Sequence, residues 1–117
     1  MPKHELKVSL AQMRDHALEA VTLAKDRSRQ DLDSDRMLNL SLVRLLEVIG
    51  EAANRVSRQD RARYPSVPWS QVIALRNRLI HAYDEVDLDI VWKIVMDDLP
   101  LLLDELNAIL NTFGLSD

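Results

Sequence analysis

Apolar residues recur along the first part of the chain at intervals of three and four, which is the spacing of one face of an α-helix. In the first segment these positions are Leu6, Leu10, Met13, Ala17, Ala20, Val21 and Ala24. The helix that they predict ends near Arg27, because the polar sequence SRQDLDSD follows without this spacing. Asp33 or Ser34 in that sequence can cap a second helix.

A second and a third helix are predicted on either side of a connector that contains proline. The apolar face of the second helix comprises Leu38, Leu42, Leu45, Leu46, Ile49, Ala52, Ala53 and Val56. In the connector SRQDRARYPSVPWS, Pro68 has a fixed φ that suits the first position of a helix. The third helix is therefore expected to run from about Pro68 to Tyr83.

A fourth helix is predicted after the turn DEVDLD, with Asp87 or Asp89 as its cap and an irregularity near Pro100. Its apolar face comprises Leu88, Val91, Val95, Leu99, Leu102, Leu106, Ile109 and Phe113. The pattern favours one all-α domain over residues 1–117, an up-and-down four-helix bundle with a kinked C-terminal helix. Residues 91–110 are apolar on more than one face, so a homodimer is expected.

Two residues depart from the aliphatic pattern of the second helix. An ion pair with Glu47 or Glu51 would explain Arg44, and the alternative places Glu51 near a functional cleft. Glycine costs about 1 kcal/mol relative to alanine inside a helix, so a close crossing by another helix is expected at Gly50.

The composition excludes several classes of protein. The chain has no cysteine, which excludes a disulfide framework and a thiolate metal site. His4 and His16 have no partner at ligand spacing, so neither a metal nor another cofactor is expected. No apolar run approaches the roughly 20 residues that cross a membrane, and no leader pattern opens the chain. A cytoplasmic protein without a membrane partner is expected.

Charge is distributed unevenly about a formal net value of −4. Residues 84–117 are strongly acidic, whereas residues 55–81 carry six arginines and the single acid Asp60. A phosphate backbone responds to a local basic patch, so RNA stays a candidate partner despite the acidic total. The predicted RNA-binding residues are Arg55, Arg58, Arg61, Arg63 and Arg78. A solvated arginine-rich loop explains the pattern about as well.

The sequence ALRNRLIHAYDEV, residues 74–86, places polar groups in an otherwise apolar helix. Asn77 and His81 are four residues apart and share a helix face, with Arg76 and Tyr83 on the neighbouring one. A histidine can act as acid or base near neutral pH, and an arginine can stabilise charge on a phosphate. Such a pair suits RNA cleavage by attack of the 2′-OH on the adjacent phosphorus, without a metal.

A purely structural explanation of the same residues stays open. Arg76 could pair with Asp84 or Glu85, His81 could cap the end of the helix, and Tyr83 could pack in the core. Spacing alone favours this explanation.

The sequence RNRLIHAY, residues 76–83, resembles the R-x-x-x-x-H-x-Y motif of the HEPN superfamily. The sequences EVIGEAANRVS at 47–57, YPSVPWSQVIALRNRLIHAYDEVD at 64–87 and VWKIVMDDLPLL at 91–102 resemble its HepT-like branch, in the same order. This resemblance implies a metal-independent ribonuclease toxin, in which two chains form one cleft. It also implies roles for three residues: Arg76 binds the scissile phosphate, His81 is the acid or base, and Asn77 orients one of them.

The resemblance further implies a partner, a nucleotidyltransferase antitoxin of the MntA type that attaches AMP to the motif tyrosine, here Tyr83. Phosphates added beside Arg76 and His81 would fill the site with negative charge. Two other functions stay open: a non-catalytic subunit that binds nucleotide or substrate for the transferase, and a purely structural dimerising bundle.

Overall fold

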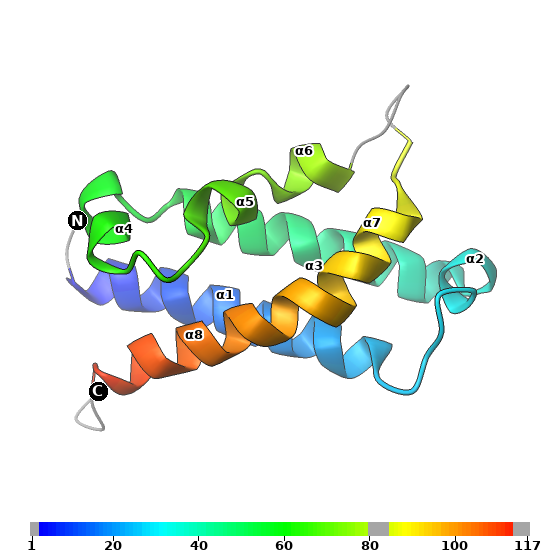
Figure 1. Ribbon diagram of the computed structural model, residues 1–117, viewed down its shortest axis with the longest axis horizontal. Helices are drawn as coiled ribbons and strands as arrows, with labels where there is room; N and C mark the ends of the chain where they lie inside the picture. The colour runs from blue at the N-terminus through cyan, green and yellow to red at the C-terminus, as the bar shows by residue number, and fades with distance from the viewer. Residues whose placement is uncertain (1–2, 80–84, 114–117) are drawn as a thin grey trace.

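The computed structural model describes residues 3–79 and 85–113, with the backbone alone at residues 3 and 4. The regular structure of these residues is helical, which confirms the predicted all-α fold. The helices are α1 (Lys3–Ala24), α2 (Asp31–Ser34), α3 (Arg36–Asn54), α4 (Arg58–Arg63), α5 (Trp69–Ile73), α6 (Leu75–Leu79), α7 (Leu88–Lys93), the π-helix η2 (Ile94–Asp98) and α8 (Leu99–Asn111), shown in Figure 1.

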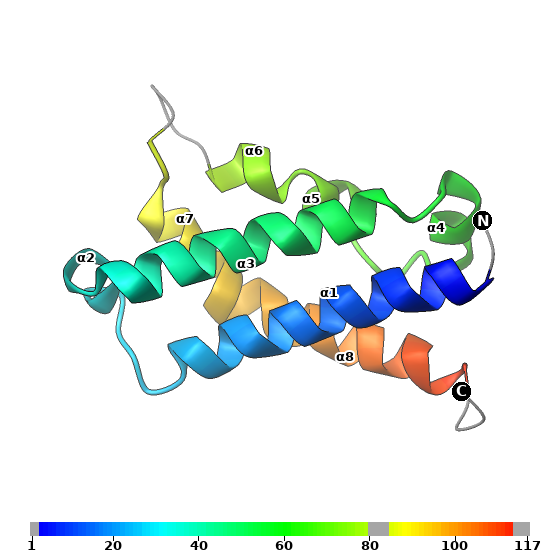
Figure 2. The same ribbon diagram turned by 180° about the vertical axis from the view of Figure 1, so that it is seen from behind.

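Three long helical segments form the body of the bundle: α1, α3 and the continuous run α7–η2–α8. α1 and α3 lie side by side in opposite directions, and α8 packs along α1 (Figures 1 and 2). The apolar positions predicted for the first two helices are all buried, except that Val21 is only partly so. Burial of these faces against one another explains why the helical spacing of the sequence predicts the core so well.

The connection between α1 and α3 differs in detail from the prediction. α1 ends at Ala24, before Arg27, and Asp26 follows with a left-handed φ of 62°. Asp33 and Ser34 are not caps, because they lie within the short helix α2. The cap of α3 is Asp35, whose side chain accepts a hydrogen bond from the Leu38 N–H at 3.1 Å.

The predicted third helix is divided. Pro68 precedes α5 as its N-cap rather than opening the helix, since its ψ of 71° is not helical. Ala74, with φ −83° and ψ 6°, separates α5 from α6. Residues 80–83 of the predicted helix lie outside the described residues.

The fourth helix begins as predicted at Asp87, whose side chain accepts hydrogen bonds from the Asp89 and Ile90 N–H groups. Pro100 does not break it. A wider π-helical turn precedes the proline, in which the Leu99 N–H donates to the Ile94 carbonyl. This turn accommodates a residue that has no N–H and would otherwise crowd the preceding turn. In the described part of the chain, no helix is both long and apolar enough to cross a membrane.

Candidate functional site

The described half of the RNRLIHAY motif is the helix α6, which packs against α3, α5 and α7. Leu75 and Leu79 are four residues apart, face the core and are buried. Arg76 and Asn77 lie on the opposite side and are exposed. The motif therefore presents a guanidinium and an amide to solvent from a helix fixed by two leucines.

His81 and Tyr83 lie outside the described residues, so the roles predicted for them stay predictions. The two ends of the segment that contains them are joined, because the Asp87 N–H donates to the Leu79 carbonyl at 2.8 Å. The last residue of α6 thus contacts the cap of α7 directly.

The exposed guanidinium of Arg76 makes no hydrogen bond or ion pair within residues 3–79 and 85–113. The alternative pairing of Arg76 with Glu85 is therefore wrong, and Asp84 lies outside the described residues. Among the described residues, no acceptor occupies the donors of Arg76, whose planar arrangement suits phosphate oxygens.

Arg78 differs from Arg76, because its guanidinium already has a partner. Its Nη2 lies 3.4 Å from Oδ2 of Asp98, at the end of η2. The Lys93 ammonium lies 3.9 Å from the other oxygen of the same carboxylate. Asp98 could not be predicted from the sequence as a partner of the motif, since it lies on another helix and belongs to a strongly acidic segment.

Gly50 of α3 contacts the junction between α5 and α6. A β-carbon built at Gly50 would lie 3.0 Å from the Val72 carbonyl oxygen and 3.6 Å from Cβ of Leu75. The close crossing predicted from this glycine is confirmed, and it sets the distance between α3 and the motif helix. Arg44, on the same helix, pairs at 3.7 Å with both Glu47 and Glu51, which confirms the ion-pair explanation.

The connector arginines, Arg55, Arg58, Arg61 and Arg63, lie around α4, at one end of the bundle. Figures 1 and 2 show α6 nearer the middle, separated from α4 by α5. Three of the four guanidinium groups already have neighbours in the fold. Arg55 donates to Gln12 at 3.2 Å, Arg61 to the Asn54 carbonyl at 3.2 Å, and Arg63 contacts Asp60 at 3.4 Å.

Comparison with known proteins identifies the family of this chain. The family profile described as "Ribonuclease HepT-like" matches residues 10–109, most of the chain. The chain belongs to the HepT-like ribonuclease family.

Relatives of this HepT-like protein carry names of the same kind. "Putative RNase MJ1380" of Methanocaldococcus jannaschii is 32% identical over 109 residues, covering 93% of this chain and 100% of its own. "Probable ribonuclease HepT" of Thermococcus cleftensis is 34% identical, covering 72% of this chain and 80% of its own. "Putative RNase TTE0752" of Caldanaerobacter subterraneus is 34% identical, covering 71% and 74%. No solved structure matches the HepT-like chain significantly.

Membership of this family makes the exposure of Arg76 and Asn77 on α6 informative about function. A short helix that exposes an arginine and an asparagine is unremarkable in an arbitrary helical protein. In a HepT-like ribonuclease, the same two groups open the motif that the resemblance marks as catalytic, and RNA is the substrate class.

Proposed function

We propose that this HepT-like ribonuclease is a metal-independent endoribonuclease, active as a homodimer in the cytoplasm, and the toxin of a toxin–antitoxin pair. The observation that carries the proposal is α6: within a family of ribonucleases, it holds Arg76 and Asn77 toward solvent, with both side chains exposed. His81 follows in the same motif, five residues after Arg76.

The proposed reaction divides among these three residues. His81 accepts the proton of the 2′-OH, and the resulting oxygen forms a bond to the adjacent phosphorus. Arg76 stabilises the negative charge that accumulates on the phosphoryl oxygens, and Asn77 orients the phosphate or the histidine. The bond from phosphorus to the 5′ oxygen breaks, and that oxygen takes up a proton from an acid. The products are a 2′,3′-cyclic phosphate and a 5′-OH end.

RNA binding would extend beyond α6. The connector arginines are proposed to contact the strand at the α4 end of the bundle. Arg58 is exposed and, in the described part of the chain, its guanidinium has no partner. It therefore offers a phosphate contact that requires no rearrangement of the fold.

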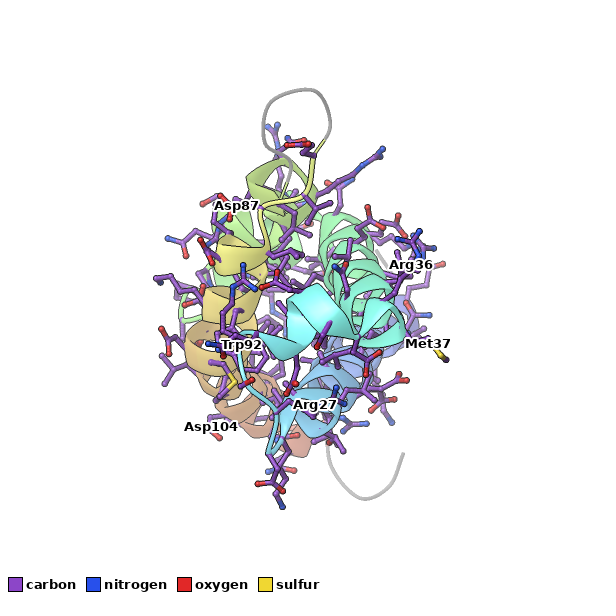
Figure 3. The ribbon with its side chains drawn as sticks, turned by 90° about the vertical axis from the view of Figure 1, so that its right-hand side faces the viewer. Arg27, Arg36, Met37, Asp87, Trp92 and Asp104 are labelled. Carbon is purple, nitrogen blue, oxygen red and sulfur yellow. The ribbon has the colours of Figure 1, made fainter. Side chains whose placement is uncertain are left out.

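The test is cleavage of RNA by the purified protein and by Arg76→Ala and His81→Ala. Each substitution should lower the rate by roughly 10²-fold or more, the effect of losing an acid–base group or a donor to the transition state. Arg36→Ala is the matched control, because Arg36 is an exposed arginine at the start of α3 and points outward in Figure 3. Cleavage should persist in EDTA and leave cyclic phosphate ends.

Full activity of His81→Ala, or activity that EDTA abolishes, would contradict the mechanism. RNA that binds but is never cut would instead support the non-catalytic subunit. The mass in solution tests the homodimer separately.

The proposed antitoxin is a nucleotidyltransferase of the MntA type that attaches AMP to Tyr83. Co-expression with such an enzyme should relieve the growth arrest that the proposed toxin is expected to cause. It should also raise the mass of the wild-type chain by one AMP group. Tyr83→Phe should keep its mass, so an equal mass increase in this variant would place the modification elsewhere.

A further inference from the structure

The orientation of α6 depends on its neighbours, since it has only five residues. Isolated helices of this length are not stable in water, so tertiary contacts must fix the rotation of α6 about its axis. Leu75 and Leu79 supply the apolar contacts. Successive residues turn by about 100° around a helix, so Arg78 lies roughly 200° from Arg76 and cannot face the same way.

The polar contact on that second side is the ion pair between Arg78 and Asp98. Their side chains are 33% and 38% exposed, so the pair lies at the edge of the interface between α6 and η2. A cavity of about 30 Å³ lies beside the pair, bordered by Leu75, Arg78, Ile94 and Asp98 among others. The ion pair links α6 to η2 across the edge of this cavity and therefore restrains the rotation of α6.

The π-helical turn explains how Asp98 is held. Lys93 and Asp98 are five residues apart, and in an α-helix such residues point about 140° away from one another. In a π turn the residue five positions along lies approximately above the first, because the hydrogen bonds run from i to i+5. The 3.9 Å contact between Lys93 and Asp98 follows from this register.

We propose that Asp98 is a positioning residue for the α6 site: with the π-helical turn that carries it, it holds Arg78 and so keeps Arg76 and Asn77 directed toward RNA. The inference rests on the proposed function. It assigns Arg78 to the support of the site rather than to direct RNA contact. It also explains how an acid can lie near a phosphate-binding helix, since two cations neutralise its charge.

The test is Asp98→Asn, which removes the charge and keeps the size of the side chain. The variant should lower kcat about tenfold, within the range that misplacement of a reacting group produces, and change KM less than about twofold. Asp98→Glu should recover part of the rate. The single reversal Arg78→Asp should be as impaired as Asp98→Asn, and combining it with Asp98→Arg should restore activity.

Direct RNA contact by Arg78 predicts the opposite pattern. Arg78→Ala would then raise KM, and it would flatten the salt dependence of binding by about 0.7 log units per log unit of salt. Asp98→Asn would free the guanidinium and tighten binding. Either result overturns the positioning role.

Amide hydrogen exchange in α6 provides a readout that does not depend on cleavage. Asp98→Asn should speed exchange in α6 and leave α1 unchanged. If the wild-type chain cuts no RNA, the proposed function fails, and this measurement alone decides the positional role. Equal exchange in both proteins would then overturn it.

Discussion

Gly50→Ala tests how closely α3 holds the motif helix. The added methyl group would lie 3.0 Å from the Val72 carbonyl oxygen and 3.5 Å from that of Ile73. Both oxygens belong to the backbone, so a side-chain rotation cannot relieve the contact. The chain between α5 and α6 must move away from α3 by a few tenths of an ångström.

Two opposing terms set the change in stability. Alanine is favoured over glycine inside a helix by about 1 kcal/mol. Overpacking of a close contact costs about 1–3 kcal/mol. The net effect should be a loss of about 0–2 kcal/mol, small against the usual free energy of unfolding of roughly 5–15 kcal/mol.

The effect on cleavage should be larger than the effect on stability. Leu75, whose Cβ lies 3.6 Å from the added group, is the first residue of α6, so the displacement passes directly to Arg76. Misplacement of a reacting group by about 1 Å can cost about 10²-fold in rate. A shift of a few tenths of an ångström should cost about tenfold.

Urea unfolding and single-turnover cleavage would measure the two quantities on the same samples. Ser41→Ala is the matched control, because Ser41 is exposed on the same helix and gains helix propensity without a new contact. Gly50→Ala would refute the reasoning if it stabilised the protein by about 1 kcal/mol, as at an open helix position, and cleaved RNA at the wild-type rate.

Two further predictions concern ion pairs. Hydrogen bonds from the Ser28 N–H to Asp31 and from Arg27 to Asp35 lower the pKa of both carboxyl groups below the ordinary value of 3.8, so their stabilising effect is complete above that value. This stabilising effect should be lost as the pH falls through the lowered pKa values. Asp35→Asn keeps a side chain that can cap the helix, and it should reduce the dependence of thermal unfolding on acid pH. An equal pH dependence in the variant and the wild-type protein would contradict this. Arg44→Ala should change the free energy of urea unfolding by less than about 1 kcal/mol, because its pairs are long and its side chain is 64% exposed; a loss well above that would mean that Arg44 has another role.

Helical spacing in the sequence could predict the core but not the ends of the helices. Leu42, Leu46 and Ile49 recur on one face of α3, so their burial follows from local order alone. The residue that caps this helix could not be predicted from the local sequence, because several residues of the types that cap helices precede it: Asp31, Asp33, Ser34 and Asp35. The bond between Arg27 and Asp35, at 2.7 Å, ties the end of α1 to the residue that caps α3, and this contact depends on the fold. Figure 3 shows Arg27 just below α2.

The division of the predicted third helix into α5 and α6 also depends on a contact made in the fold. Ala74 is a good helix former, and nothing in its local sequence marks a break. α3 passes so close to this point that a β-carbon at Gly50 would lie 3.0 Å from the Val72 carbonyl oxygen. The pairing of Arg78 with Asp98 likewise joins residues 20 apart in sequence, on different helices. Family resemblance could therefore identify the motif, and helical spacing could group its polar residues, but neither could predict the contacts that hold it.

The acidic C-terminal segment illustrates why formal charge must be considered after pairing. Asp87 caps α7, Asp89 lies 2.7 Å from Arg29, and Asp98 contacts two cations, so each of these three acids is engaged within the fold. Asp104, by contrast, is exposed on α8 and well separated from Asp87 in the end-on view of Figure 3. Screening at physiological salt acts over about 8 Å, which limits the reach of exposed charges. Among the described residues, Arg76 therefore presents to a phosphate at α6 a guanidinium without an acidic partner, even though the segment that follows the motif is acidic.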